Sequence, residues 1–167
     1  TEIRSNLALA YEKLGDLKQL RFSMERSIPT GRDGNRNISD RSAKTFKQLG
    51  LPPTLSAENR LIRRAQEQLG SLGGGNHFIE ICIDKDGGAW ILLHSGSRNI
   101  GKELAEKHIE KAKASLKEAL SQLPDPDLAH FIEGTREFKD YIGDMLWAQA
   151  FAKENRREML LRLLKDV

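Results

Sequence analysis

The sequence predicts an α+β fold, with a central antiparallel hairpin and long helices packed on it. Two short apolar, β-branched runs, residues 78–84 and 89–94, flank the turn Asp86-Gly87-Gly88, which is typical of a hairpin. Helical patterns lie before and after these runs and do not alternate with strands. A length of 167 residues suits one domain, so residues 1–167 are treated as a single segment.

Composition narrows the class of protein. Hydrophobic residues make up 38% of the chain and charged residues 31%, which argues against disorder. No apolar run approaches the roughly 20 residues of a membrane helix, so no membrane partner is expected. The single cysteine, Cys82, can form no internal disulfide, which favours a reducing, cytoplasmic compartment. The chain begins without Met or a signal-peptide pattern, and we expect it to be a segment of a longer protein.

Positive charge is concentrated before the hairpin. Residues 21–70 carry ten Lys or Arg against five Asp or Glu, whereas residues 71–167 carry 14 against 16. Such a basic region can attract phosphate groups or nucleic acid. The alternative is a solvated, variable surface, which composition alone favours.

The segments before the hairpin are bounded by capping and breaking residues. Asp16 and Ser56 are suited to cap helices, and Pro29, Gly50 and Gly70 to end them. In chain order we expect a strand at 3–8, helices at about 17–27, 41–49 and 57–69, and a polar loop at 30–42.

Two longer helices are predicted after the hairpin. The first covers about 100–121 and is followed by a loop containing Pro124 and Pro126. Thr135 caps the second, which covers about 136–164. Its apolar face consists of Phe138, Tyr141, Ile142, Met145, Ala148, Ala152 and Met159.

A glycine run leads into the first strand, in the order Gly73-Gly74-Gly75-Asn76-His77-Phe78-Ile79-Glu80. In an ideal strand Asn76, Phe78 and Glu80 share one face, and His77 and Ile79 share the other. The first face offers an amide, an aromatic ring and a carboxylate, which together can bind a purine nucleotide. His77 can bind a metal ion as a neutral imidazole. The alternative is a glycine turn before a strand whose polar residues face water.

A second polar group, His94-Ser95-Gly96-Ser97-Arg98, follows the second strand and leads into a helix. Unpaired N–H groups at a helix N-terminus bind anions, and Arg98 can add a bidentate phosphate contact. The alternative is a simple helix cap at Ser95 or Ser97, with His94 in the core. Because a hairpin joins the two groups, His77 and His94 are expected at the same end of the sheet.

Five other residues are given structural roles only. We expect His108 to be half-buried in its helix and His130 to lie at the surface. Cys82, Trp90 and Trp147 are expected in the core.

Several of these blocks resemble the RtcB-type RNA ligases. The resemblance is carried by Leu69-Gly70-Ser71-Leu72-Gly73-Gly74-Gly75-Asn76-His77-Phe78-Ile79-Glu80 and Leu93-His94-Ser95-Gly96-Ser97-Arg98. Family-like blocks also occur, in the family's order, at Arg4-Ser5-Asn6-Leu7, Ile28-Pro29-Thr30-Gly31 and residues 147–156. The resemblance covers nearly the whole chain and is weakest over residues 32–54.

The resemblance implies a role for each matching residue. His77 and His94 would each bind one of two Mn²⁺ ions. Asn76 would contact the nucleotide phosphate, and Arg98, with Ser95 and Ser97, would lie at nucleotide or RNA phosphate. The GTP-binding residues would be Asn76, His77, Phe78, Ile79 and Glu80, with Phe78 and Glu80 at the guanine.

The implied reaction joins RNA ends bearing a 2′,3′-cyclic phosphate or a 3′-phosphate to 5′-hydroxyl ends, through a GMP-histidine intermediate. The RNA would be a broken or spliced tRNA, and GTP and Mn²⁺ would be required. The family's metal-binding Asp and Cys precede the equivalent of Arg4, and its third metal-binding His and nucleophilic His follow the equivalent of Val167. We therefore expect the isolated segment to be inactive.

Two alternatives remain open from the sequence: a non-catalytic nucleotide- or RNA-binding module, and an inert structural fragment. The sequence identifies no activating protein.

Overall fold

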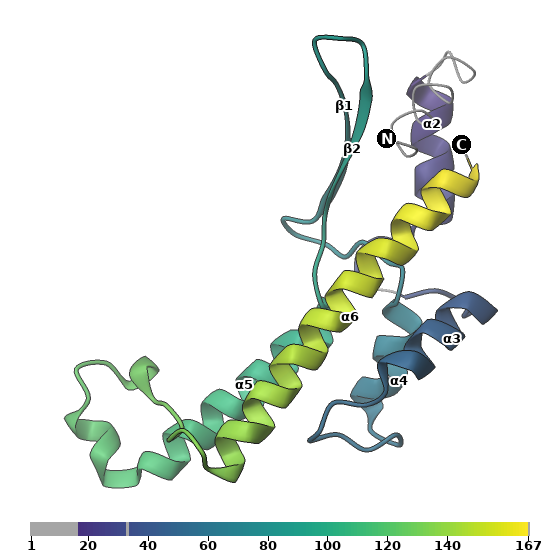
Figure 1. Ribbon diagram of the computed structural model, residues 1–167. Helices are drawn as coiled ribbons and strands as arrows, with labels where there is room; N and C mark the ends of the chain where they lie inside the picture. Colours follow the sequence, from purple (N-terminus) through teal and green to yellow (C-terminus); the bar gives the residue numbers. More distant parts are fainter. Residues whose placement is uncertain (1–16, 33, 167) are drawn as a thin grey trace.

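A computed structural model describes residues 17–32 and 34–166 of the chain (Figure 1). The predicted α+β class is confirmed. The predicted strand at 3–8, the family-like block at 4–7 and the Asp16 cap lie outside the described residues. The elements are α2 (Leu17–Ser27), α3 (Asp40–Leu49), α4 (Arg60–Gln68), β1 (Phe78–Ile83), β2 (Ala89–His94), α5 (Arg98–Leu116), the 3₁₀ segments η1 (Lys117–Gln122) and η2 (Pro126–Leu128), and α6 (Arg136–Asp166).

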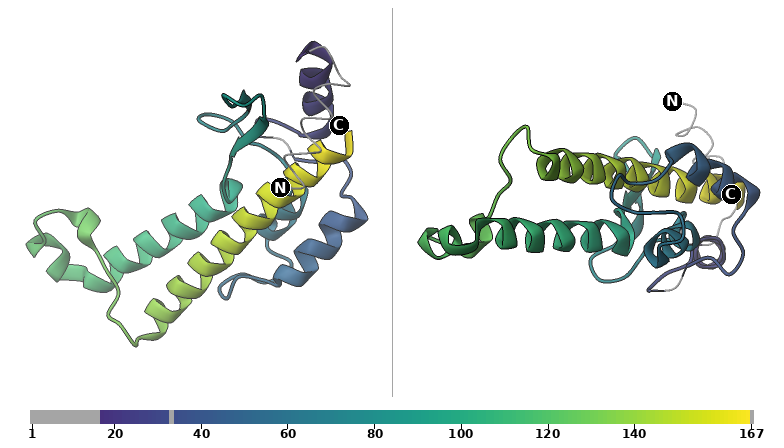
Figure 2. Two further views of the ribbon diagram at one scale, coloured as in Figure 1. Left: turned by 45° about the horizontal axis from the view of Figure 1, so that its top comes forward. Right: turned by 90° about the horizontal axis from the view of Figure 1, so that it is seen from below.

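The two long helices α5 and α6 run antiparallel and side by side, with α3 and α4 beside them (Figures 1 and 2). Apolar faces of all four helices form the main core, because each carries apolar residues at helical spacing. Phe151 of α6 is fully buried there and lies against Trp147 and Phe46, at ring-centroid distances of 5.5 and 6.3 Å. Trp147 is therefore a core residue, as predicted.

The hairpin β1–β2 extends from this helical body toward the end where α2 and the C-terminal part of α6 meet (Figure 1). Its antiparallel register pairs Phe78 with His94 and Cys82 with Trp90. The inner face packs on a second, smaller core through Ile79, Ile91 and Leu93, beside Ile28, Met159 and Leu163.

The outer face of the hairpin is exposed to solvent. Trp90 is 48% exposed, so the expectation of a core tryptophan is wrong. Its indole Nε1 instead donates to Asp84 Oδ2 at 2.7 Å. Cys82 lies on the same face and is half-buried, so its expected place in the core is wrong as well. Two strands alone cannot cover both faces of a sheet, so large apolar side chains remain in solvent on this one.

One of the predicted helix caps is wrong, and another is confirmed. Helix α4 begins at Arg60, and Asn59 Oδ1, not Ser56, accepts the Leu61 N–H at 2.9 Å. Ser39 caps α3 by accepting the Ser42 N–H at 3.2 Å. The Thr135 cap is confirmed, since its hydroxyl accepts the Phe138 N–H at 3.3 Å.

Among the described residues, no helix is both long enough and apolar enough to cross a membrane.

Candidate functional site

Chain segments that are far apart in the sequence meet at the base of the hairpin. Residues 29–31 run parallel to residues 72–73, where the Gly31 N–H donates to the Gly73 carbonyl at 2.8 Å and the Leu72 N–H to the Pro29 carbonyl at 2.9 Å. Residues 30–42 were expected to form only a loop, and this long-range pairing is an addition to the prediction. It places the Ile28–Gly31 block beside the glycine run.

His77 and His94 come together at this base. Their ring centroids are 6.0 Å apart, with an interplanar angle of 47°. Phe78 stacks on His94 at 5.4 Å and 13°, because the hairpin register places those two residues opposite each other. The sequence prediction that the two imidazoles lie at one end of the sheet is confirmed.

The His77 ring is packed against the glycine run. Its Nδ1 atom is buried and has no hydrogen-bond partner within the described part of the chain. Gly73 has φ of 102°, and a Cβ at that position would overlap both His77 Nδ1 and the Arg98 guanidinium. Burial lowers the pKa of His77, the charges of Arg98 and His94 lower it further, and the Leu72 carbonyl acts in the opposite direction. A lowered pKa favours the neutral imidazole, which is the form that binds metal ions.

Arg98 joins three of the segments. Its Nε donates to Ser71 Oγ at 3.0 Å and its Nη2 to the Gly31 carbonyl at 2.7 Å. It begins α5 with φ of 56°, a left-handed conformation that is uncommon outside glycine. Burial, and then the charge of Arg64, lower the pKa of its guanidinium. Arg98 therefore fixes the loops around His77 as well as placing positive charge there.

The other predicted residues are placed differently from one another. Asn76 is exposed in the turn before β1, and the strand alternation begins only at Phe78. Phe78, 43% exposed, and Glu80 lie on the outer face with His94, whereas Ile79 faces the inner core.

The two serines after β2 do not lie together. The Ser95 hydroxyl donates to the Leu72 carbonyl at 2.8 Å, so it bridges two loops and is not free to cap α5. The Ser97 hydroxyl lies against Gly101 and lines a hollow of about 240 Å³ between α5 and α6, away from the histidine pair.

Asn155 of α6 is a site residue that residue-by-residue reasoning from the sequence missed. Its side chain is fully buried, and Oδ1 accepts the N–H groups of Gly70 and Ser71 at 2.7 and 3.2 Å. Its Nδ2 donates to the carbonyls of Ser71 and Gly96 at 3.2 and 3.1 Å. One amide thus ties the loop before β1 to the loop after β2. The sequence did contain a signal for this role. Asn155 lies four residues after Phe151, on the same helix face, and an amide on a buried face needs hydrogen-bond partners.

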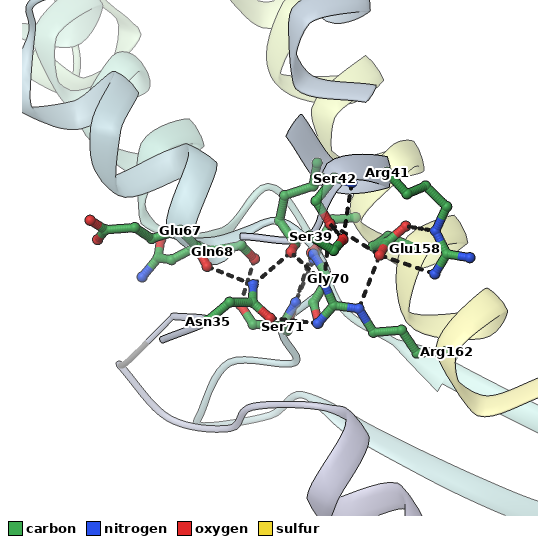
Figure 3. Close-up of polar contacts among 12 residues, drawn as sticks. Asn35, Ser39, Arg41, Ser42, Glu67, Gln68, Gly70, Ser71, Glu158 and Arg162 are labelled. Atoms are coloured by element: carbon green, nitrogen blue, oxygen red, sulfur yellow. Dashed lines mark hydrogen bonds and ion pairs between the residues drawn. The ribbon is translucent and has the colours of Figure 1, made fainter. Parts of the chain in front are cut away.

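Glu158 and Arg162, on the same helix as Asn155, belong to a charged network (Figure 3). Glu158 accepts from Arg41 at 2.8 Å and from Arg162 at 3.0 Å. Arg162 continues to the Gly70 carbonyl at 3.0 Å and to Asn35. The C-terminal part of α6 therefore holds α3 and the start of the glycine-rich loop in place.

His108 lies in a separate environment between α5 and α6. It is 2% exposed, not half-buried as predicted, and its Nε2 is 2.8 Å from Asp144 Oδ2. Asp144 also accepts the Thr54 N–H at 3.1 Å and the Thr54 hydroxyl. His130 is exposed, as predicted. Neither histidine adjoins the hairpin base.

The candidate metal ligands among the described residues are the two imidazoles at the base of the hairpin. Two imidazoles, one with a buried and unpartnered nitrogen, can offer nitrogen ligands to a divalent metal ion, and Mn²⁺ would also favour oxygen ligands beside them. No group of three or more His, Cys, Asp or Glu suited to hold a metal ion occurs in residues 17–32 and 34–166.

Comparison with known proteins identifies relatives of the chain. Residues 3–167 match a family described as "tRNA-splicing ligase RtcB". The chain is 38% identical to the RNA-splicing ligase RtcB of Escherichia coli K12 over 166 residues, which is 92% of this chain and 41% of that protein. It is 32% identical to the tRNA-splicing ligase RtcB of Methanopyrus kandleri over 120 residues, which is 60% of this chain and 12% of that protein. The chain thus spans about two fifths of the length of its E. coli relative.

Proposed function

The chain belongs to the RtcB family of tRNA-splicing ligases, and from this premise we propose that it supplies part of the metal and GTP site of an RNA ligase. The proposed reaction joins RNA ends with a 2′,3′-cyclic phosphate or a 3′-phosphate to 5′-hydroxyl ends, through a GMP-histidine intermediate. Broken or spliced tRNA is the proposed substrate. We assign the nucleophilic histidine to a part of the parent protein outside this chain.

The observation that carries the proposal is the approach of His77 and His94 to 6.0 Å on two strand ends. Each imidazole can contribute one nitrogen ligand, and the lowered pKa of His77 favours the neutral ring. We propose Mn²⁺ as the metal, which when bound supplies a positive charge that orients and neutralises phosphate oxygens. The remaining ligands would come from elsewhere in the parent protein.

The residues around the histidines are proposed to bind GTP. The outer face of the hairpin exposes Phe78 for packing on guanine and the Glu80 carboxylate for accepting its N–H groups, while Asn76 can donate to a phosphate oxygen. Arg98 would add positive charge to the phosphate end of the site. Ile79 faces the inner core, so we assign it the support of β1 and not contact with guanine.

The decisive experiment measures Mn²⁺ binding and GMP attachment in the full-length protein with His77→Ala and with His94→Ala. Both variants should lose Mn²⁺ affinity and GMP attachment while remaining folded. His130→Ala is the matched control, because that histidine is exposed and remote from the hairpin. Normal GMP attachment in either site variant would contradict the proposed metal-binding role.

A second candidate, a nucleotide- or RNA-binding module without chemistry, is favoured for the isolated chain by its having only two clustered imidazoles in the described part. Incubation of residues 1–167 with labelled GTP and Mn²⁺ should leave no covalent adduct. A stable GMP adduct on the isolated chain would contradict this and would place a nucleophile within it. We also propose a cytoplasmic location, which the single cysteine, Cys82, supports.

A further inference from the structure

The outer face of α4 carries a row of arginines. Ile62 and Ala65 of this helix are buried in the main core. Positions 60, 63, 64 and 67 therefore share the opposite face, at spacings of three and four residues. Three of these four positions are Arg60, Arg63 and Arg64, and all three are exposed. Helical geometry alone thus gathers three guanidinium groups on one surface.

A fourth arginine is fastened to the same face by the preceding loop. Gln68 Nε2 donates to the Arg32 carbonyl at 3.1 Å, and Asn35 Nδ2 donates to the Glu67 carbonyl at 2.7 Å. A Cβ on Gly34 would collide with the Glu67 carbonyl, so the loop lies directly on the helix. The four arginines then line one hollow of about 340 Å³, with Glu67 at its edge.

The positive charge of this hollow lacks compensation in the structure. None of the four guanidinium groups forms an ion pair with a carboxylate in residues 17–32 and 34–166, and Glu67 is the single acidic side chain among those lining the hollow. Like charges held together repel each other unless an anion lies between them. Planar guanidinium groups match the oxygens of a phosphate group, to which they can donate in pairs.

The hollow lies next to the candidate site. Arg98 is held beside Gly73 and His77. Its Nη2 donates at 2.7 Å to the carbonyl of Gly31, and the next residue, Arg32, lines the hollow. A strand whose end lay at the histidine pair would therefore meet Arg98 first and the arginines of the hollow next. Several separate cations along one path suit the repeated phosphates of a nucleic acid strand.

We propose that the hollow formed by Arg32, Arg60, Arg63 and Arg64 binds the phosphate backbone of the RNA strand whose 3′ end is placed at His77 and His94. This inference rests on the proposed ligase function, but it assigns a distinct surface to the RNA. The contacts are to phosphates, so they position the strand without reading its sequence.

The test measures binding of a single-stranded RNA with a 3′-phosphate to the full-length protein over a series of salt concentrations. The triple variant Arg60→Ala, Arg63→Ala, Arg64→Ala should bind about 10-fold or more weakly at physiological salt. The slope of log affinity against log salt should also become shallower by about 0.7 for each lost phosphate contact, or about 2 in all.

The chain offers a matched control with the same change in net charge. Lys111, Arg136 and Lys139 are exposed and belong to the C-terminal part of α5 and the first turns of α6. These two helix ends lie far from α4 (Figure 1). Their triple substitution to alanine should leave both affinity and salt slope near those of the wild type. Equal losses in both triple variants would overturn the proposal, because net charge alone would then explain the binding.

GMP attachment without RNA separates this inference from the proposed function. If the α4 variant keeps GMP attachment and loses RNA affinity, the assignment is supported. If it loses GMP attachment while remaining folded by circular dichroism, the hollow serves the nucleotide and the proposal is wrong. If the wild type attaches no GMP, the ligase function fails, yet the salt slopes still decide whether the hollow binds RNA.

A charge-conserving variant guards against loss of folding in the alanine variant. Substitution of Arg60, Arg63 and Arg64 by Lys keeps the charge but removes the paired donors of each guanidinium. It should retain most of the salt slope and bind RNA more weakly than the wild type. Affinity and slope both unchanged in a folded alanine variant would refute phosphate binding at this surface.

Discussion

The two histidine environments of this molecule differ in what satisfies the imidazoles. His108 is buried and bonded to Asp144 at 2.8 Å, with the rings of Phe131 and Tyr141 edge-on at 6.1 and 5.5 Å. His77 and His94 instead lie beside each other with ring centroids 6.0 Å apart, and in the described part of the chain neither is hydrogen-bonded to a carboxylate.

This contrast shows how the same side chain serves two purposes. A buried imidazole that donates to a carboxylate inside an aromatic environment stabilises the contact between two helices. His108 Nδ1 also has no partner within the described residues, but the ring is committed to Asp144 through its other nitrogen. Two imidazoles brought together at a loop surface without an acid remain available to a cation, which is the property that the proposed function needs.

The largest expected effect comes from displacing the His77 ring while keeping the histidine itself, because the contrast with His108 depends on the position of that ring. Gly73→Ala introduces a Cβ that overlaps His77 Nδ1 and the Arg98 guanidinium, at a φ of 102°. GMP attachment in the full-length protein should fall on the order of 100-fold, as expected for misplacement of a reacting group by about 1 Å. Gly75→Ala is the control, because it shares a positive φ of 74° but a Cβ there meets no atom within 4 Å. Similar losses in the two variants would show that backbone strain, and not the position of His77, matters.

Removal of the amide that ties the two loops should have the next largest effect. Asn155→Ala leaves the N–H groups of Gly70 and Ser71 and the Gly96 carbonyl without their partner. We expect Mn²⁺ affinity, measured by calorimetry on the full-length protein, to fall between about 10- and 100-fold, as for residues that orient metal ligands. Gln149→Ala, on an exposed position of the same helix, should change it little. Unchanged Mn²⁺ affinity in Asn155→Ala would separate the loops from the metal site.

The structural histidine should show the opposite pattern. His108→Ala removes the partner of buried Asp144, and we expect the free energy of unfolding to fall by about 2 kcal/mol. Urea denaturation measures the loss, with exposed His130→Ala as the control. GMP attachment at low temperature, where the variant is folded, should stay within about 2-fold of the wild type. A selective loss of GMP attachment with unchanged stability would contradict the structural role given to His108.

The smallest expected effect is a pH dependence from the scaffold behind the site. Burial of Glu158 opposes ionisation, but Arg41, Arg162 and Ser42 outweigh it, so the pKa of this carboxyl is lowered from 4.5. A lowered pKa stabilises the fold above pH 4.5, and this stabilisation is lost as the pH falls through the folded-state value. Glu158→Gln should cost about 1 kcal/mol at pH 7 and converge with the wild type in acid. A constant difference between them from pH 7 to pH 3, in urea denaturation, would refute this origin.

Much of the hairpin and of the helical frame was predictable from local patterns. The alternation around Asp86-Gly87-Gly88 predicts strands within one residue of the observed ends, because turn chemistry fixes the register. That register also brings His77 beside His94. The family-like blocks around residues 28–31, 69–80, 93–98 and 147–156 meet at one place, which no single block indicates alone.

What the sequence did not predict depends on tertiary partners. Trp90 is a large apolar residue of the kind usually buried in a core, but it lies on the uncovered face of a two-stranded sheet. His108 is buried because Asp144, 36 positions later in the chain, meets it between α5 and α6. The same carboxylate also accepts from Thr54, 90 positions before Asp144. Asn59, and not the predicted Ser56, caps α4. Both residue types cap helices well, and only the folded loop decides between them.

Because the hairpin depends on its neighbours, it is expected to open locally more easily than the helical core. A pair of strands is marginally stable by itself. Here one face packs on Ile28, which follows α2, and on Met159 and Leu163 in the C-terminal part of α6. Amide hydrogens in the middle of β1 and β2 should therefore exchange with deuterium well before those around Phe151. If this packing loosened, both imidazoles would move with the hairpin. The order of the candidate site therefore depends on the C-terminal turns of a single long helix.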